Sequence, residues 1–133
     1  MVDDKTKIHS TQIFLDTGDL IQIIEGTKDY RIRGFTTNPS LMKKAGVRSY
    51  RSFARHVLDN TDLPVSFEVF ADDPLEMERQ ALEIASWGKN VVVKIPFMTT
   101  KRELTAHVVE KLAKAGVPVN VTAIMTFEQA AYA

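Results

Sequence analysis

The stretch Asn90-Val-Val-Val-Lys-Ile-Pro96 decides the fold and places one charge in an apolar segment. Its three consecutive valines predict a buried strand, and Pro96 limits that strand because proline has no backbone N–H to donate to a sheet. Lys94 could reach solvent past the strand end or form half of an ion pair. It could also lie in a dry site, where an amine loses basicity and becomes a nucleophile toward carbonyls. The strand alone leaves these interpretations open.

The length and charge of the chain narrow the classes of protein. Its 133 residues fit a single domain, residues 1–133, without a linker or low-complexity tract. Lys plus Arg and Asp plus Glu both number 17, so the net charge is zero. We therefore expect no general binding to nucleic acid or to anionic membranes, which usually requires a basic surface. The absence of cysteine and the wide spacing of the three histidines predict no metal site.

No segment has the length of a membrane-spanning helix, and residues 1–7 lack the apolar core of a signal peptide. We therefore expect a cytoplasmic protein. Residues 1–11 are polar, and we expect them to be frayed.

Strand and helix signals alternate along the rest of the chain. The predicted strands cover residues 13–16, 34–37, 64–70, 90–96 and 117–125. The predicted helices follow residues 17–19, cover 39–46, 48–60 and 73–87, and begin at two capping boxes, 100–103 and 126–129. Asp73 is the predicted N-cap of the 73–87 helix, and Gly46 and Gly116 are predicted to end their helices.

This alternation predicts an α/β fold with a parallel sheet, either doubly wound or part of a (β/α)₈ barrel. Because side chains alternate along a strand, each strand has one apolar face and one face with polar residues near its carboxyl end. Those polar residues are Asp16, Thr36, Asn38, Glu68, Lys94, Asn120 and Thr122. A doubly wound sheet needs two apolar faces, whereas a barrel has its active site at the inner carboxyl end. The pattern therefore favours a partial TIM barrel of five parallel strands with flanking helices.

The polar set suggests a chemistry. Lys94 is the only candidate nucleophile, and Asp16 and Glu68 are carboxylates able to shuttle protons or orient water. The neutral members suit hydroxyl-rich ligands: Asn38, Asn120 and Thr122. The sequence contains no dinucleotide fingerprint and no phosphate-binding P-loop. A carboxylate pair alone would suit a glycosidase, but the neighbouring amine favours Schiff-base chemistry on a sugar carbonyl.

Four segments resemble successive motifs of the transaldolases and the related fructose-6-phosphate aldolases. They are Phe14-Leu-Asp-Thr17, Gly34-Phe-Thr-Thr-Asn-Pro-Ser-Leu41, Val92-Val-Lys-Ile-Pro96 and Asn120-Val-Thr122. The likeness runs from about residue 12 to the last residue. It implies a class I aldolase barrel in carbohydrate metabolism, as in the pentose phosphate pathway, that acts on a sugar or sugar phosphate without a cofactor or metal.

The resemblance also implies a role for each polar residue. Lys94 would form the Schiff base with a ketose donor, and Asp16 would take the proton from the hydroxyl whose C–C bond breaks. Glu68 and Thr122 would hold the water that forms and hydrolyses the imine. The residues expected to bind the donor unit are Asn38, Asn120 and Thr36.

The chain also departs from the family. The family's barrel has eight strands, and five are predicted here. In similar proteins the remaining part carries residues that recognise the substrate phosphate, including an arginine after the sixth strand, and nothing in this sequence matches it. We therefore expect impaired turnover.

An open sheet of five strands would expose two strand edges and inner apolar side chains. We therefore expect a homo-oligomer, in the form of a symmetric dimer in which two partial barrels face or pair with each other. Exchange of the C-terminal helix or the fifth strand is one route to such a dimer. The alternative functions are an inactive, self-associating scaffold and a doubly wound binding domain.

Overall fold

The computed structural model describes residues 11–133. The predictions for the N-terminus, a frayed segment over residues 1–11 and no signal peptide in residues 1–7, therefore fall outside the described residues except at residue 11. The strands are β1 (Ile13–Asp16), β2 (Ile32–Thr36), β3 (Val65–Glu68), β4 (Val91–Pro96) and β5 (Val119–Thr122). The helices are α1 (Leu20–Gly26), α2 (Pro39–Lys44), α3 (Tyr50–Asn60), α4 (Pro74–Ala85), α5 (Ala106–Lys114) and α6 (Phe127–Tyr132). None of these helices in residues 11–133 is both long enough and apolar enough to cross a membrane.

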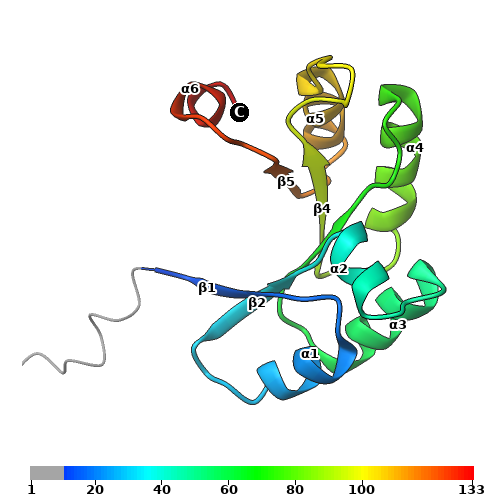
Figure 1. Cartoon of the computed structure of the whole chain (residues 1–133), viewed down its shortest axis with the longest axis vertical. Helices are drawn as coiled ribbons and strands as arrows, with labels where there is room; N and C mark the ends of the chain where they lie inside the picture. Colours follow the sequence, from blue (N-terminus) through cyan, green and yellow to red (C-terminus); the bar gives the residue numbers. More distant parts are fainter. Residues whose placement is uncertain (1–10) are drawn as a thin grey trace, which may run out of the picture.

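The five strands form one parallel sheet in the order β1-β2-β3-β4-β5. Figure 1 shows the sheet curling between β1 and β4, with helices α1 to α5 along its outer side. Helix α6 stands apart from the other helices and has no buried residue. The predicted partial barrel is thus confirmed: the structure is a curled half-barrel of parallel strands.

The core lies between the outer face of the sheet and the helices. The strand side chains predicted to face the helices are fully buried in the three central strands: Phe35, Val65, Phe67, Val91, Val93 and Ile95. They pack in one cluster with helix residues that include Val57, Met77, Ala81 and Leu112. The outer face is therefore apolar, as a sheet covered by helices requires.

On the inner face, Gly34 of β2 lies against the ring of Phe14 on β1. A Cβ atom at Gly34 would lie 2.2 Å from Phe14 Cε1 and 2.7 Å from the Pro64 carbonyl oxygen. Only glycine leaves room for the Phe14 ring, which lies against β2 at Gly34, the residue that pairs with Phe14 in the sheet.

Most of the predicted helix ends are confirmed. Asp73 caps α4 by accepting hydrogen bonds from two backbone N–H groups, at 3.1 Å each. The capping box of Thr126 and Gln129 begins α6. Gly46 and Gly116 follow helices with φ of +77° and +75°, a region in which glycine lacks the strain of other residues.

The predicted capping box at residues 100–103 is wrong, because α5 begins only at Ala106. Thr100 instead donates its backbone N–H and its hydroxyl to the carboxylate of Asp72, at 2.7 and 2.5 Å. Arg102 adopts a left-handed φ of 65°, which a helix does not allow. The residues predicted to form the first turn of the helix therefore form a loop, which is hydrogen-bonded to the β3–α4 connection at Asp72. The third and fifth strands are also shorter than predicted, β3 ending at Glu68 and β5 at Thr122.

Two leucines test where the core lies. Leu112 on α5 is 1% exposed and Leu75 on α4 is 73% exposed. We expect Leu112→Ala to lower the free energy of unfolding by about 2–5 kcal/mol, because it leaves a cavity under α5. Leu75→Ala is the matched control and should change it by less than about 0.5 kcal/mol. Urea unfolding followed by circular dichroism measures both, and equal effects would contradict the packing described above.

Candidate active site

Lys94 lies on β4 between residues whose side chains are buried among the helices. Its own side chain points to the inner face and is 9% exposed. The Nζ atom donates a hydrogen bond to the backbone carbonyl oxygen of Thr37 at 3.1 Å. Thr37 follows β2, so the amine reaches past β3 to the carboxyl end of the next strand but one. Lys94 therefore does not snorkel to bulk solvent.

Glu68 is the nearest charged group to this amine. Parallel pairing of β3 with β4 places Glu68 opposite Lys94, and the Oε2 and Nζ atoms lie 3.9 Å apart, at the outer limit of an ion pair. Burial raises the pKa of Glu68 above its ordinary value; the charge of Lys94 opposes this rise and that of Asp16 adds to it. A carboxyl group with a raised pKa exchanges protons closer to neutral pH, as acid–base catalysis requires.

Asp16 ends β1, where it pairs with Thr36 of β2. The Thr36 hydroxyl donates a hydrogen bond to Asp16 Oδ1 at 2.7 Å, and the carboxylate is otherwise exposed. Asp16 and Glu68 are the last residues of β1 and β3, and the charge of Asp16 contributes to the raised pKa of Glu68. The structure thus brings Asp16, Glu68 and Lys94 to the same end of the sheet.

Asn120 and Thr122 come from β5, on the other side of the lysine strand. Asn120 pairs with Lys94 and donates a long hydrogen bond of 3.4 Å to the Ser66 hydroxyl on β3. Thr122 pairs with Pro96 and is half-buried. Both residues lie on the same face as the amine, as their positions in the strand predict.

Asn38 also caps a helix, a role that the sequence pattern does not reveal. It is the N-cap of α2, and its Oδ1 atom accepts a hydrogen bond from Leu41 N at 2.9 Å. Pro39 occupies the first position of that helix, where a missing N–H costs nothing. The NH₂ group of Asn38 has no hydrogen-bond partner within residues 11–133, so it can contact a ligand.

Three contacts at the site were not predicted. The Thr37 backbone carbonyl accepts a hydrogen bond from the Lys94 amine. Because every residue has a backbone carbonyl, the residue type at position 37 could not predict this contact. Ser66 contacts Asn120, and its position on the same face as Glu68 was the available signal. Tyr50 donates its hydroxyl to the backbone carbonyl of Glu68 at 2.7 Å, although its spacing predicts only a core residue of α3.

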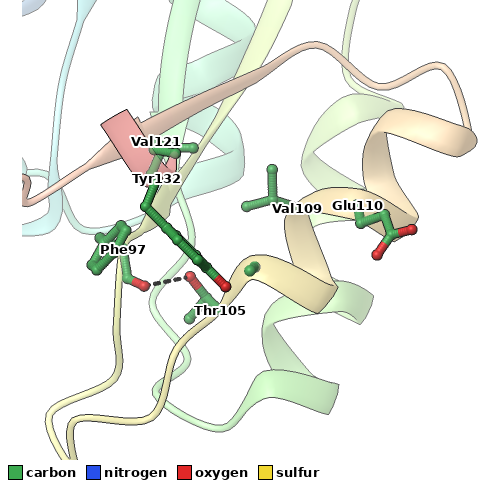
Figure 2. Close-up of a pocket in the computed structure, with 8 residues that line it drawn as sticks. Phe97, Thr105, Val109, Glu110, Val121 and Tyr132 are labelled. Carbon is green, nitrogen blue, oxygen red and sulfur yellow. Dashed lines mark hydrogen bonds between the residues drawn. The ribbon is translucent and has the colours of Figure 1, made fainter. Parts of the chain in front are cut away.

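A separate pocket of about 310 Å³ lies against α5, and Figure 2 shows its lining. Phe97 and Tyr132 form one side, with ring centroids 5.9 Å apart, and Val109 and Glu110 of α5 form the other. None of the predicted site residues lines this pocket. It is therefore distinct from the lysine site.

The inner face thus carries one buried amine, two carboxylates, and several hydroxyl and amide groups near the carboxyl ends of the strands. An amine in this position adds to carbonyl carbons, and neighbouring carboxylates move the protons that addition and loss of water require. Within residues 11–133, no three His, Asp or Glu side chains come together as metal ligands.

Comparison with known proteins agrees with this description. The family model described as "Transaldolase/Fructose-6-phosphate aldolase" matches residues 13–133. The chain is 42% identical over 122 residues to a probable transaldolase of Dehalococcoides mccartyi, covering 90% of this chain and 54% of the relative. It is 41% identical over 119 residues to a probable transaldolase of Thermoanaerobacter sp., covering 90% and 53%.

A probable transaldolase of Methanococcus maripaludis is 40% identical over 119 residues, which cover 90% of this chain and 53% of that protein. The chain thus spans about half the length of the curated relatives it matches. The matched region contains every predicted site residue and all five strands. The chain belongs to the transaldolase/fructose-6-phosphate aldolase family.

Proposed function

We propose that this chain performs transaldolase-like Schiff-base chemistry, the transfer or cleavage of a ketose or ketose phosphate through an imine on Lys94. The observation that carries the proposal is the placement of the Lys94 amine. It is almost fully buried, hydrogen-bonded to the Thr37 carbonyl and 3.9 Å from the carboxyl group of Glu68. Family membership supports the same chemistry.

The first step forms the imine. Glu68 takes a proton from the Lys94 ammonium, and the Nζ lone pair that this frees attacks the carbonyl carbon of the ketose. The nitrogen then gives up a proton and the carbonyl oxygen takes one up, which gives a carbinolamine. Loss of that oxygen as water leaves a protonated imine. Glu68 is the acid and base for these transfers, since its raised pKa suits proton exchange, and Thr122 holds the water beside it.

The second step breaks a carbon–carbon bond. Asp16 removes the proton from the hydroxyl next to the bond, the hydroxyl oxygen becomes an aldehyde oxygen, and the bond electrons move into the imine to form an enamine. The aldehyde leaves. The enamine then attacks an acceptor aldehyde, or takes a proton and is hydrolysed. Three side chains hold the donor unit in this scheme: Thr36, Asn38 and Asn120.

The described residues support imine formation more fully than transfer to an acceptor. Imine formation needs only Lys94 and its neighbours, whereas transfer also requires a positioned acceptor, which contributes several powers of ten in rate. A cytoplasmic location is part of this proposal.

We further propose that two copies of this chain associate. Within residues 11–133, strands β1 and β5 are the edges of the sheet, and the outer side of each carries backbone groups without a sheet partner there. Near the β5 edge, Met125 and Phe127 are 82% and 83% exposed, and near the β1 edge Ile13 is 47% exposed. A second copy supplies a strand edge that can pair with the open backbone groups. It also supplies apolar side chains that can cover the exposed ones. The same surface supports the alternative function, an inactive self-associating scaffold.

Borohydride trapping tests the imine. Incubation with dihydroxyacetone or fructose 6-phosphate, followed by reduction, should leave a stable adduct on Lys94, because reduction makes the imine bond permanent. Mass spectrometry of peptides locates the adduct. Lys94→Ala should abolish it, whereas Lys89→Ala, whose side chain is 85% exposed, should leave it unchanged. A folded wild-type protein without an adduct would refute the proposed chemistry and favour the scaffold.

The raised pKa of Glu68 predicts a pH-dependent stability. Below the ordinary glutamate pKa, Glu68 is protonated in both the folded and the unfolded chain, so it costs nothing. As the pH rises from there through the raised folded-state pKa, the unfolded chain loses its proton first, and the wild type loses stability relative to Glu68→Gln. We expect the variant to be the more stable protein at neutral pH, with the difference closing on acidification.

Urea unfolding at several pH values measures that difference. The opposite result would contradict the prediction: the wild type would be more stable than Glu68→Gln at neutral pH and would lose this advantage in acid. It would mean that the attraction between Glu68 and Lys94 lowers the pKa of Glu68 more than burial raises it.

Light scattering tests the association of two copies. The wild type at micromolar concentration should have twice the mass of the chain, and Phe127→Asp should shift it toward monomer, because a charge replaces an apolar contact. Leu75→Asp, at a position on α4 in the helix layer that is 73% exposed, is the control. A monodisperse wild-type monomer would rule the dimer out.

A further inference from the structure

Tyr50, the first residue of α3, lies on the opposite side of the sheet from Lys94. Its ring makes edge-to-face contacts with Phe67, Phe70 and Trp87, with centroids 6.0, 4.8 and 5.2 Å apart. Its hydroxyl donates a hydrogen bond of 2.7 Å to the backbone carbonyl oxygen of Glu68. The ring contacts explain why an aromatic residue stands here, but they do not require the hydroxyl.

The ladder between β2 and β3 explains the hydroxyl. Phe35 N donates to the Pro64 carbonyl at 2.9 Å, and two residues later Thr37 N donates to the Ser66 carbonyl at 3.1 Å. Continued by two residues on each strand, the ladder would join residue 39 to the carbonyl of Glu68. Residue 39 is a proline and has no N–H to donate.

The chain therefore needs another donor at the carboxyl end of β3. A partly buried backbone carbonyl without a hydrogen-bond donor lowers the stability of the folded protein. Tyr50 supplies the missing bond from the helix layer, and it does so at the residue whose side chain faces Lys94. Pro39 is the first residue of α2 and directly follows its N-cap, Asn38. The residue that interrupts the ladder is therefore next to a residue of the proposed site.

We propose that Tyr50 is a positioning residue: its hydroxyl replaces the ladder bond that Pro39 cannot make and so fixes the Glu68 backbone with the carboxyl group directed at the Lys94 amine. The consequence for the reaction rests on the function proposed above. Burial and the nearby charge of Glu68 raise the pKa of Tyr50, so the hydroxyl keeps its proton and remains a donor throughout the neutral range.

Titration of Glu68 by carbon-13 NMR tests the positioning without relying on activity. The protein is labelled at glutamate side chains, and Glu68→Gln assigns the Glu68 signal. Tyr50→Phe keeps the ring and removes only the hydroxyl. Because burial is the largest cause of the raised Glu68 pKa, a released Glu68 should titrate at a lower pH in Tyr50→Phe, closer to an ordinary glutamate. Asp16 and Lys94, the charged groups that also face Glu68, are present in both proteins.

Tyr30→Phe is the matched control, since Tyr30 is 79% exposed. It should leave the Glu68 titration as in the wild type. An unchanged Glu68 titration in folded Tyr50→Phe would overturn the proposal.

The rate of borohydride trapping adds a second readout. Tyr50→Phe should slow trapping about fivefold, the effect of one hydrogen bond of about 1 kcal/mol. In the Glu68→Gln background the same change should have no further effect, because the residue being positioned is gone. An equal loss in both backgrounds would contradict action through Glu68. Absence of trapping in the wild type would refute the proposed chemistry, while the NMR titration would still decide the role of Tyr50.

Discussion

The parallel pairing of β3 with β4 is the constraint on which the site depends. It sets Glu68 opposite Lys94 and so places a carboxyl group beside an amine that is almost removed from water. The pair is long, at 3.9 Å, and burial raises the pKa of the carboxyl despite the nearby positive charge. The site therefore costs stability, as catalytic groups with perturbed pKa values commonly do.

The one-sided sheet makes this arrangement possible. Helices α1 to α5 lie along the outer face, and the buried core is built there. The inner face is thus free to carry polar groups at the carboxyl ends of the strands, as in barrel enzymes. The same construction leaves β1 and β5 as open edges and α6 without a buried residue.

Two backbone carbonyl groups, those of Thr37 and Glu68, accept hydrogen bonds at the site. Asn38 and Pro39 end β2 and begin α2 within two residues, which directs the Thr37 carbonyl to the Lys94 amine. The same turn leaves the Glu68 carbonyl without a donor from β2, and Tyr50 provides one from behind the sheet. The helix layer and the inner face are therefore linked at the strand that carries Glu68.

The sequence by itself determined the order of the strands, their faces and the polar residues at their ends, because strand alternation and helix caps are local properties. Only the tertiary structure decided where α5 begins, since Thr100 bonds to Asp72, 28 residues away in the chain. It also decided that the Thr37 carbonyl meets the Lys94 amine and that the Tyr50 hydroxyl meets the Glu68 carbonyl. A carbonyl is common to every residue, and a tyrosine on an apolar helix stripe looks like core. Such partners become visible only when distant segments come together.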